Sequence, residues 1–171
     1  MNNKEVIKNL KSKNQSIILE TLAYIKQEGN NEILKEVINL LHSTNDTIIR
    51  DEIVDILEHV KEQDSVLTLV QSLENPDYED ILSLLVSACW KNGLDYSASV
   101  EIFTDIFIKS DFQLAFDAFT VIDNIEEIEN RIADACIFRL KNTIEDIQDE
   151  KKPLYFELIK LIDDKKENPA D

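Results

Sequence analysis

Apolar residues recur along this chain at the intervals of one helix face. In residues 31–62, isoleucine, leucine and valine repeat every three or four positions, a spacing that predicts amphipathic helices of about 12–16 residues. The segment HSTND interrupts the repeat, and Asn45 or Asp46 is suited to accept hydrogen bonds from the first free N–H groups of the second helix. The stretch therefore predicts an antiparallel helical hairpin.

The segment ENPD separates a second pair of helices, predicted at about residues 65–74 and 77–91. Pro76 has no N–H and disfavours helical geometry at the residue before it, so the first helix must end at Asn75. The fixed φ of proline suits the entry to a helix, and Asp77 is expected to cap that helix. ENPD is therefore predicted to be a tight corner between two packed helices.

Three more pairs follow the same pattern, so that about five hairpins, or about ten helices, extend from Asn3 to Lys166. Glycine occurs only twice and proline three times, and no segment alternates apolar and polar residues as a half-buried strand does. The sequence therefore predicts an all-α fold with a frayed tail, ENPAD. The remaining predicted helices are 4–14 with 15–29, 95–110 with 111–127, and 128–147 with 153–166.

The second helices of three consecutive pairs share one register. Their apolar positions align with offsets of 32 and then 33 residues. A fixed period in that range is the sequence signature of a helical solenoid, in which each hairpin covers an apolar face of its neighbour. The aligned residues are Ile49, Ile53, Val54, Ile56 and Leu57; Ile81, Leu85, Val86, Ala88 and Cys89; and Leu114, Ala118, Phe119, Val121 and Ile122.

Two segments, VLTLVQSLENPDYEDILSLLVSACW and LHSTNDTIIRDEIVDILEHV, resemble HEAT repeats, especially the short bacterial and armadillo-type kind. In that family the first helix ends in a Leu-x-Asp/Asn-Pro corner, and the second opens with Asp-x-x-Val-Arg. Here Asp46, Ile49 and Arg50 stand in the Asp, Val and Arg places. The resemblance implies a right-handed α-solenoid forming a single domain over residues 1–171, with regular repeats at about 14–126, capping helices at about 127–166 and the tail at 167–171.

The repeats also depart from the family pattern. The Arg place holds Leu82 and Ala115 in the next two copies, so an Asp–Arg ladder is reduced to one rung. Tetratricopeptide and ankyrin repeats are disfavoured, because neither their Trp-Leu-Gly-Tyr nor their Thr-Pro-Leu-His signature is present. An irregular helical bundle with accidental periodicity stays as the alternative.

The formal charge of −17, from 35 acidic and 18 basic residues, disfavours binding to nucleic acid or to an anionic membrane. It suits a protein partner of basic or mixed charge, although acidity also serves solubility alone. The N-terminal segment has no apolar signal region, and no apolar run reaches about 18 residues. Cys89 and Cys136 lie in apolar helical stretches, so we expect buried reduced thiols in a cytoplasmic protein.

The residue types of catalysis and metal binding are scattered along the chain. His42 lies at a predicted helix end, where it suits the terminal carbonyls, and His59 has Asp55 one turn earlier as a solvated partner. The two cysteines are too far apart in sequence for a short zinc motif. Gly29 and Gly93 each follow a second helix and are expected to end it rather than to form a phosphate loop. We therefore expect no enzymatic activity, no cofactor and no metal site.

Two acidic runs are interpreted as solvated surface, with cation or basic-partner binding as the alternative. Glu126, Glu127 and Glu129 are expected to open the long helix near residue 128, where negative charge is favourable. The second run, expected in a loop before Pro153, contains Glu145, Asp146, Asp149 and Glu150.

In HEAT-like solenoids the second helices line the concave side, so their outward positions are the candidate partner-binding residues. Tyr24 and Phe116 are unusual outward choices, and each ring is expected either to be displayed as an interface anchor or to fold back onto a neighbouring repeat. Trp90 is expected to pack inside. Carried back by 31 residues to the first pair, the register gives three columns: Glu20, Asp51, Ser83 and Phe116; Tyr24, Asp55, Ser87 and Thr120; and Glu28, His59, Lys91 and Asn124.

The functional hypothesis is a non-enzymatic interaction module or scaffold that holds a protein partner on an acidic concave surface. One alternative is a small acidic inhibitor or immunity-type protein that neutralises a basic enzyme or nucleic-acid-binding protein. A weaker alternative is an enzyme or ligand-binding protein of the HEAT-like class, some of which act on modified DNA bases or attach pigments. The sequence assigns neither the partner nor the oligomeric state.

Overall fold

The structure, a computed structural model, describes residues 1–28, 31–147 and 149–167. Within these residues it contains ten α-helices joined by turns and short 3₁₀ segments, and no strand beyond one isolated backbone bridge. The prediction of an all-α fold is therefore confirmed. The prediction for Gly29 lies outside the described residues.

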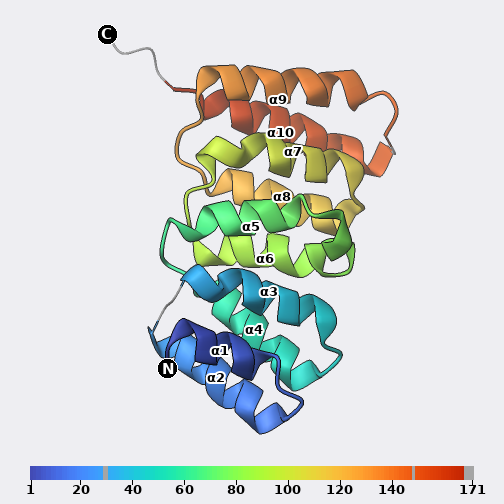
Figure 1. Cartoon of the computed structure of the whole chain (residues 1–171). Helices are drawn as coiled ribbons and strands as arrows, with labels where there is room; N and C mark the ends of the chain where they lie inside the picture. Colours follow the sequence, from blue (N-terminus) through green and yellow to red (C-terminus); the bar gives the residue numbers. More distant parts are fainter. Residues whose placement is uncertain (29–30, 148, 168–171) are drawn as a thin grey trace. The chain divides into compact units, whose positions relative to one another are not determined.

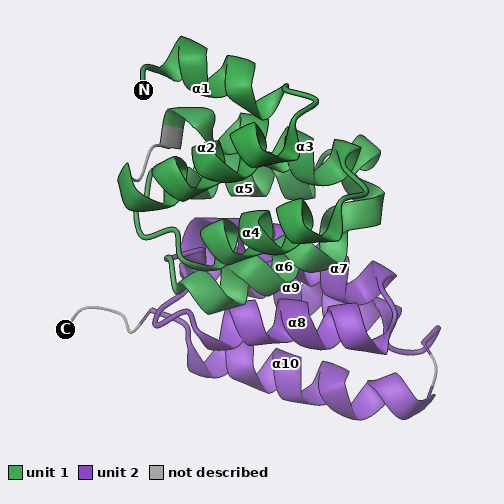
Figure 2. Cartoon of the chain, turned by 90° about the horizontal axis from the view of Figure 1, so that it is seen from below, with its two compact units in different colours: residues 1–94 green, residues 95–171 purple. Residues whose placement is uncertain are grey.

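The chain divides into two compact units, Met1–Leu94 and Asp95–Asp171 (Figure 2). Each unit is described separately below, and the prediction of a single repeat domain stays a prediction. Unit 1 contains α1 Asn3–Leu10, α2 Gln15–Glu28, α3 Leu34–Ser43, α4 Thr47–Glu58, α5 Ser65–Leu73 and α6 Leu82–Asn92. Unit 2 contains α7 Val100–Lys109, α8 Phe112–Asp123, α9 Asn130–Thr143 and α10 Lys152–Asp164.

Unit 1 is built from two rows of helices (Figure 1). One row contains α1, α3 and α5, and the other contains α2, α4 and α6. The two helices of each pair, α1 with α2, α3 with α4 and α5 with α6, pack against each other across the rows. The apolar stripe of each helix faces the space between the rows, as its amphipathic pattern requires. The fully buried side chains there include Leu22, Val37, Ile53, Leu69 and Leu85.

Unit 2 repeats this arrangement with four helices, because α7 packs on α8 and α9, and α10 packs on α9 and α8. Its core is more aromatic than that of unit 1. Phe107 and Tyr155 are completely buried, with ring centroids 4.8 Å apart, and Phe103 lies 5.3 Å from the ring of Tyr96. Ala115 and Ala118 on α8 are also fully buried, and such small side chains leave room for large rings across the core.

The predicted cap of α4 is confirmed. The Asp46 carboxylate accepts hydrogen bonds from the N–H groups of Ile48 and Ile49 at 3.0 and 3.2 Å. These are two of the donors that the first turn of a helix leaves without a backbone partner. The local sequence therefore determines where this helix begins.

The ENPD corner differs from the prediction. Asn75, not Asp77, provides the cap: its side chain accepts from the Asp77 N–H at 3.1 Å. Residues Pro76–Ile81 form a 3₁₀ turn, and α6 begins only at Leu82. The reason lies at Tyr78, whose backbone (φ −100°, ψ 20°) departs from helical geometry while its buried ring reaches α3, where the hydroxyl bonds to Asn39.

The long helix predicted from residue 128 to 147 is shorter than expected, since α9 runs from Asn130 to Thr143. Ile128 is held in an isolated parallel bridge: its N–H donates to the Lys165 carbonyl at 2.8 Å, and its carbonyl accepts from Glu167 at 3.1 Å. A residue paired in this way cannot begin a helix. Glu126 and Glu127 consequently precede α9 and Glu129 stands at its N-cap, so the predicted acidic first turn is wrong.

Candidate interaction surface

Three neighbouring helices of unit 1 carry most of the predicted partner-binding residues. α2, α4 and α6 lie side by side, so equivalent positions on them are brought together (Figure 1). The remaining predicted residues, Phe116, Thr120 and Asn124, lie on α8 in unit 2. In unit 1 the exposed members are Glu20, Glu28, Asp51, His59, Ser83 and Lys91, and the half-buried members are Tyr24, Asp55 and Ser87.

Basic side chains on the same three helices neutralise part of the predicted acidic surface. Lys26 of α2 forms an ion pair with Asp55 of α4, and His59 Nδ1 lies 3.3 Å from the other Asp55 carboxylate oxygen. The hydrogen bond from Lys26 holds the pKa of Asp55 below its usual value. Lys91 of α6 pairs with Glu58 of α4 at 2.6 Å. The predicted His59–Asp55 pair is confirmed, but the cross-helix pairs could not be seen from the outward columns alone.

Glu20 and Asp51 are two exposed carboxylates of this surface that form no ion pair among the described residues. They occupy equivalent positions on α2 and α4, and both are exposed. Among the residues that the structure describes, neither carboxylate has an ion-pair or hydrogen-bond partner. These two carboxylates are therefore accessible to a cation of a partner, whereas Asp55 would have to give up Lys26 first.

Tyr24 is not displayed in the way its column position suggests. Its side chain is half-buried, and its hydroxyl donates to the Met1 carbonyl at 3.0 Å. The ring therefore folds back, but onto the N-terminal segment beside its own helix pair rather than onto a neighbouring repeat.

Phe116, by contrast, is displayed. Its side chain is 47% exposed and stacks on the half-buried ring of Phe119, with centroids 6.3 Å apart and planes at 10°. Phe112, one turn earlier on α8, is 52% exposed. The predicted neighbour Thr120 directs its hydroxyl back to the Phe116 carbonyl at 2.9 Å, so this position contributes to the helix rather than offering a free donor.

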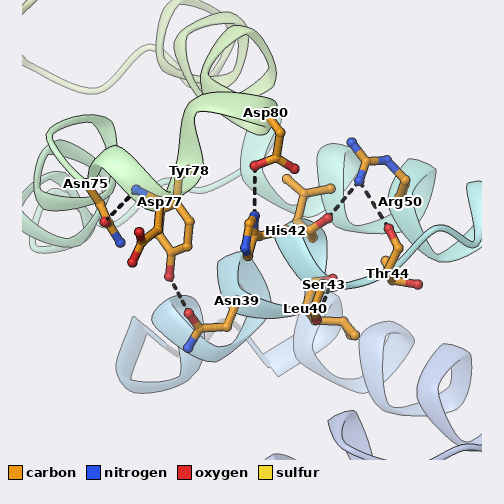
Figure 3. A network of polar contacts seen from close by, with 11 residues as sticks. Asn39, Leu40, His42, Ser43, Thr44, Arg50, Asn75, Asp77, Tyr78 and Asp80 are labelled. Carbon is orange, nitrogen blue, oxygen red and sulfur yellow. Dashed lines mark hydrogen bonds and ion pairs between the residues drawn. The ribbon is translucent and has the colours of Figure 1, made fainter.

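His42 binds a carboxylate instead of the terminal carbonyls of α3. Its Nδ1 lies 2.8 Å from Asp80 Oδ1, and its ring lies 5.4 Å from that of Tyr78 (Figure 3). The carbonyls predicted for His42 are taken by Arg50, whose Nη1 donates to Leu41 at 2.8 Å and to Thr44 at 3.2 Å. The expected role of His42 is therefore wrong, because an arginine from the next helix occupies that place.

The same network ties α3 to the 3₁₀ turn at residues 76–81 (Figure 3). The Tyr78 hydroxyl donates to Asn39, and the Ser43 hydroxyl donates to the Leu40 carbonyl at 3.3 Å. Both hydroxyls are thus used in bonds that hold the fold. The arrangement serves to join two elements 38 residues apart in sequence at His42 and Asp80.

The remaining reactive side chains are buried or structural. Cys89 and Cys136 are buried thiols outside any disulfide, as predicted, and burial raises the pKa of Cys136. Gly93 has φ +69°, a left-handed conformation that ends α6, again as predicted. Within the described part of the chain no group of three or more His, Cys, Asp or Glu side chains is placed to hold a metal ion. No described helix combines the length and apolarity that crossing a membrane requires.

Basic side chains close the C-terminal ends of helices in both units. Lys61 donates to the Asn92 carbonyl at the end of α6, and Lys165 donates to Asp123 and Ile125 at the end of α8. Lys151 is buried and donates to Phe107 and Ser110 at the end of α7, both at 2.7 Å, and desolvation lowers its pKa. These lysines donate hydrogen bonds to carbonyls at helix ends instead of forming ion pairs with carboxylates. Fewer lysines are therefore left to pair with surface carboxylates than the composition suggests.

Comparison with known proteins identified no relative: no protein-family model matches the chain, and no curated protein matches it significantly.

Proposed function

We propose that this protein is a non-enzymatic interaction module that holds a protein partner of basic or mixed charge on the exposed side of α2, α4 and α6. The observation that carries the proposal is the contrast among the carboxylates of this surface. Asp55 and Glu58 are paired with lysines, whereas Glu20 and Asp51, at equivalent positions of the neighbouring helices α2 and α4, have no partners among the described residues. Uncompensated charges at fixed positions steer an oppositely charged partner and select its orientation.

The architecture proposed for this module is a right-handed HEAT-like α-solenoid that serves as a scaffold. The two-row packing of unit 1 and the shared register of its second helices support this architecture. In such an arrangement one row presents an extended surface whose side chains vary freely, because the core lies between the rows. The two buried thiols support a reducing compartment, the cytoplasm, as its location.

A second candidate is a small acidic inhibitor that neutralises a basic enzyme or a nucleic-acid-binding protein. The observation that favours it is the use of lysines and an arginine at helix C-termini, which leaves the net charge of −17 concentrated in surface carboxylates. This candidate and the scaffold predict the same acidic contact, but the inhibitor must also abolish the activity of its partner.

The test is a comparative capture experiment with three tagged proteins: the wild type, E20K/D51K and the matched control E74K/E79K. Glu74 and Glu79 are exposed acids at the corner between α5 and α6, so the control makes the same charge change at another place. We expect a discrete set of basic proteins to be retained by the wild type and the control, lost from E20K/D51K, and weakened by added salt. Identical sets for all three proteins would reject this surface.

A further inference from the structure

Three exposed rings of unit 2 lie on the neighbouring helices α8 and α10; they are here called the aromatic face and defined as Phe112, Phe116 and Phe156. Their exposed fractions are 52%, 47% and 62%. Single exposed apolar residues are common on protein surfaces, so their exposure alone indicates nothing. Their relative positions on α8 and α10 are what distinguish them.

Buried positions set the register between these two helices. Ala115, Ala118 and Ile122 on α8 correspond to Tyr155, Leu158 and Ile162 on α10, each 40 residues later and each buried. With the same offset, Phe116 corresponds to Phe156.

Contacts at both ends of the helices confirm this register. Lys151, just before α10, donates to the Ser110 carbonyl just before α8, and Lys165, just after α10, donates to Asp123 and Ile125 at the end of α8. α8 and α10 are packed neighbours that start and end at the same levels. Phe116 and Phe156 therefore lie at one level on adjacent helices, with Phe112 one turn nearer the helix starts.

Carboxylates occupy the other end of the same surface. Asp123 lies seven residues after Phe116, which is about two helical turns or roughly 10 Å along α8 and returns to the same side of the helix. With the offset of 40 residues, Asp123 corresponds to Asp163, and Asp164 is the next residue, at the end of α10. Asp123 and Asp164 are both exposed, and within the described residues neither of these two carboxylates is in an ion pair. Asp163 beside them is paired with Lys166 at 2.7 Å, and Lys160 is the exposed cation between the two ends.

From this geometry we infer that α8 and α10 form a docking surface for an amphipathic segment of a partner protein. The segment carries two or three apolar side chains for Phe112, Phe116 and Phe156 and, about 10 Å further on, lysine or arginine side chains for Asp123 and Asp164. Charge decides against a second copy of this chain as the occupant, since two molecules of charge −17 would repel each other. The inference rests on the proposed function, because it specifies the partner of an interaction module.

The test uses a defined probe: a fluorescent 18-residue synthetic peptide with leucines on one helical face of its first half and lysines in its second half. Its affinity is measured by fluorescence anisotropy at low and moderate salt. Two further peptides replace the leucines by serine or the lysines by glutamate. The protein variants are F116A/F156A, D123N/D164N and F138A. The last removes an equally exposed ring (67%) from α9 and is the matched control.

We expect F116A/F156A to weaken binding by about tenfold or more, since anchor residues dominate interface energies. D123N/D164N should lose affinity mainly at low salt, F138A should bind like the wild type, and both altered peptides should bind poorly. Circular dichroism and melting temperature show whether each variant is folded.

Three results would overturn the inference. One is wild-type affinity in F116A/F156A, and another is no binding of the first peptide at low salt. The third is a dimer of the wild-type protein in sedimentation that F116A/F156A abolishes, which would assign the face to self-association.

E20K/D51K separates the two proposals. If that variant, and not F116A/F156A, loses the peptide, the aromatic face is wrong while the proposed function stands. If F116A/F156A loses the peptide and E20K/D51K captures the same proteins as the wild type, the surface assigned in the proposed function is wrong.

Discussion

The second helices of the pairs, α2, α4 and α6 in unit 1 and α8 and α10 in unit 2, expose different kinds of side chain over similar apolar cores. In unit 1, charges are paired from helix to helix, as Lys26 with Asp55 and Glu58 with Lys91. In unit 2, the corresponding surface displays Phe116 and Phe156, and the buried Lys151 is directed to helix carbonyls instead. The apolar pattern therefore determines which side of a helix is buried but does not constrain the residues at its outward positions.

In unit 2, ion pairs also link the first helices of the two pairs, α7 and α9. Arg139 of α9 forms ion pairs with Glu101 and Asp105 of α7, at 2.9 and 3.0 Å. In unit 1, by contrast, the ion pairs Lys26–Asp55 and Glu58–Lys91 link second helices of the pairs, α2 with α4 and α4 with α6. Exposed rings such as Phe116 and Phe156 are positions where an external partner can bury apolar surface.

The largest expected effect distinguishes the buried aromatic residues of unit 2 from the displayed ones. Phe107→Ala should lower the free energy of unfolding by about 4 kcal/mol, because it removes a completely buried ring beside Tyr155 and leaves a cavity. Phe116→Ala should cost less than about 1 kcal/mol, since roughly half of its ring is already in water. Urea unfolding of both variants measures the difference. Similar costs would show that Phe116 is part of the core, and the contrast between the units would fail.

A smaller effect is expected from the cations at helix ends. Lys151→Met keeps the apolar stem but leaves the Phe107 and Ser110 carbonyls without their donor, at a cost of about 2–3 kcal/mol. Lys61→Met in unit 1 should cost less than about 1 kcal/mol, because Lys61 is exposed and water can replace it at the Asn92 carbonyl. Denaturant titrations of the two variants test this. An equal loss in both would mean that burial of Lys151 adds nothing to its role.

The helix corners should behave alike in the two units. Asn75→Ala and Asp111→Ala each remove a side chain that caps a helical turn, with bonds to Asp77 N–H at 3.1 Å and Leu114 N–H at 3.0 Å, and each should cost about 1 kcal/mol. Asp77→Ala is the control and should have little effect, since Asn75 provides the cap. A larger loss for Asp77→Ala than for Asn75→Ala in thermal unfolding would restore the original prediction for this corner.

Local signals in the sequence account for much of this structure. The helical periodicity predicted the helices and most of their buried positions, and Asp46 and Gly93 marked the beginning of α4 and the end of α6 as expected. Local sequence could not show that Tyr78 is drawn to Asn39, which delays α6, or that Ile128 pairs near Lys166, which shortens α9. Both effects come from residues more than 35 positions away, whose contacts override the local preference.

The candidate surfaces show the same limit. The column alignment found Phe116 but missed Phe156, because α10 follows α8 with an offset of 40 residues rather than 32 or 33. It also did not show that Asp55 is paired with Lys26 as well as with His59, because Lys26 lies on another helix and outside the columns. Charge and aromatic content could be predicted from sequence, but pairing between helices could not.

The smallest expected effect tests this pairing through its dependence on pH. The pKa of Asp55 is held below its usual value by the hydrogen bond from Lys26, so the folded state binds that proton less readily than the unfolded state does. The carboxylate therefore contributes stability at neutral pH, and this contribution is lost as the pH falls from the ordinary value of 3.8 through the lowered pKa. The stability difference between the wild type and Asp55→Asn should accordingly shrink below about pH 4. Chemical unfolding of both proteins at pH 7 and at several values between pH 4 and pH 2.5 measures this difference. If the difference between the two proteins were the same at every pH, the ion pair with Lys26 would contribute nothing to folding, and the pairing of charges that distinguishes unit 1 from unit 2 would have no energetic meaning.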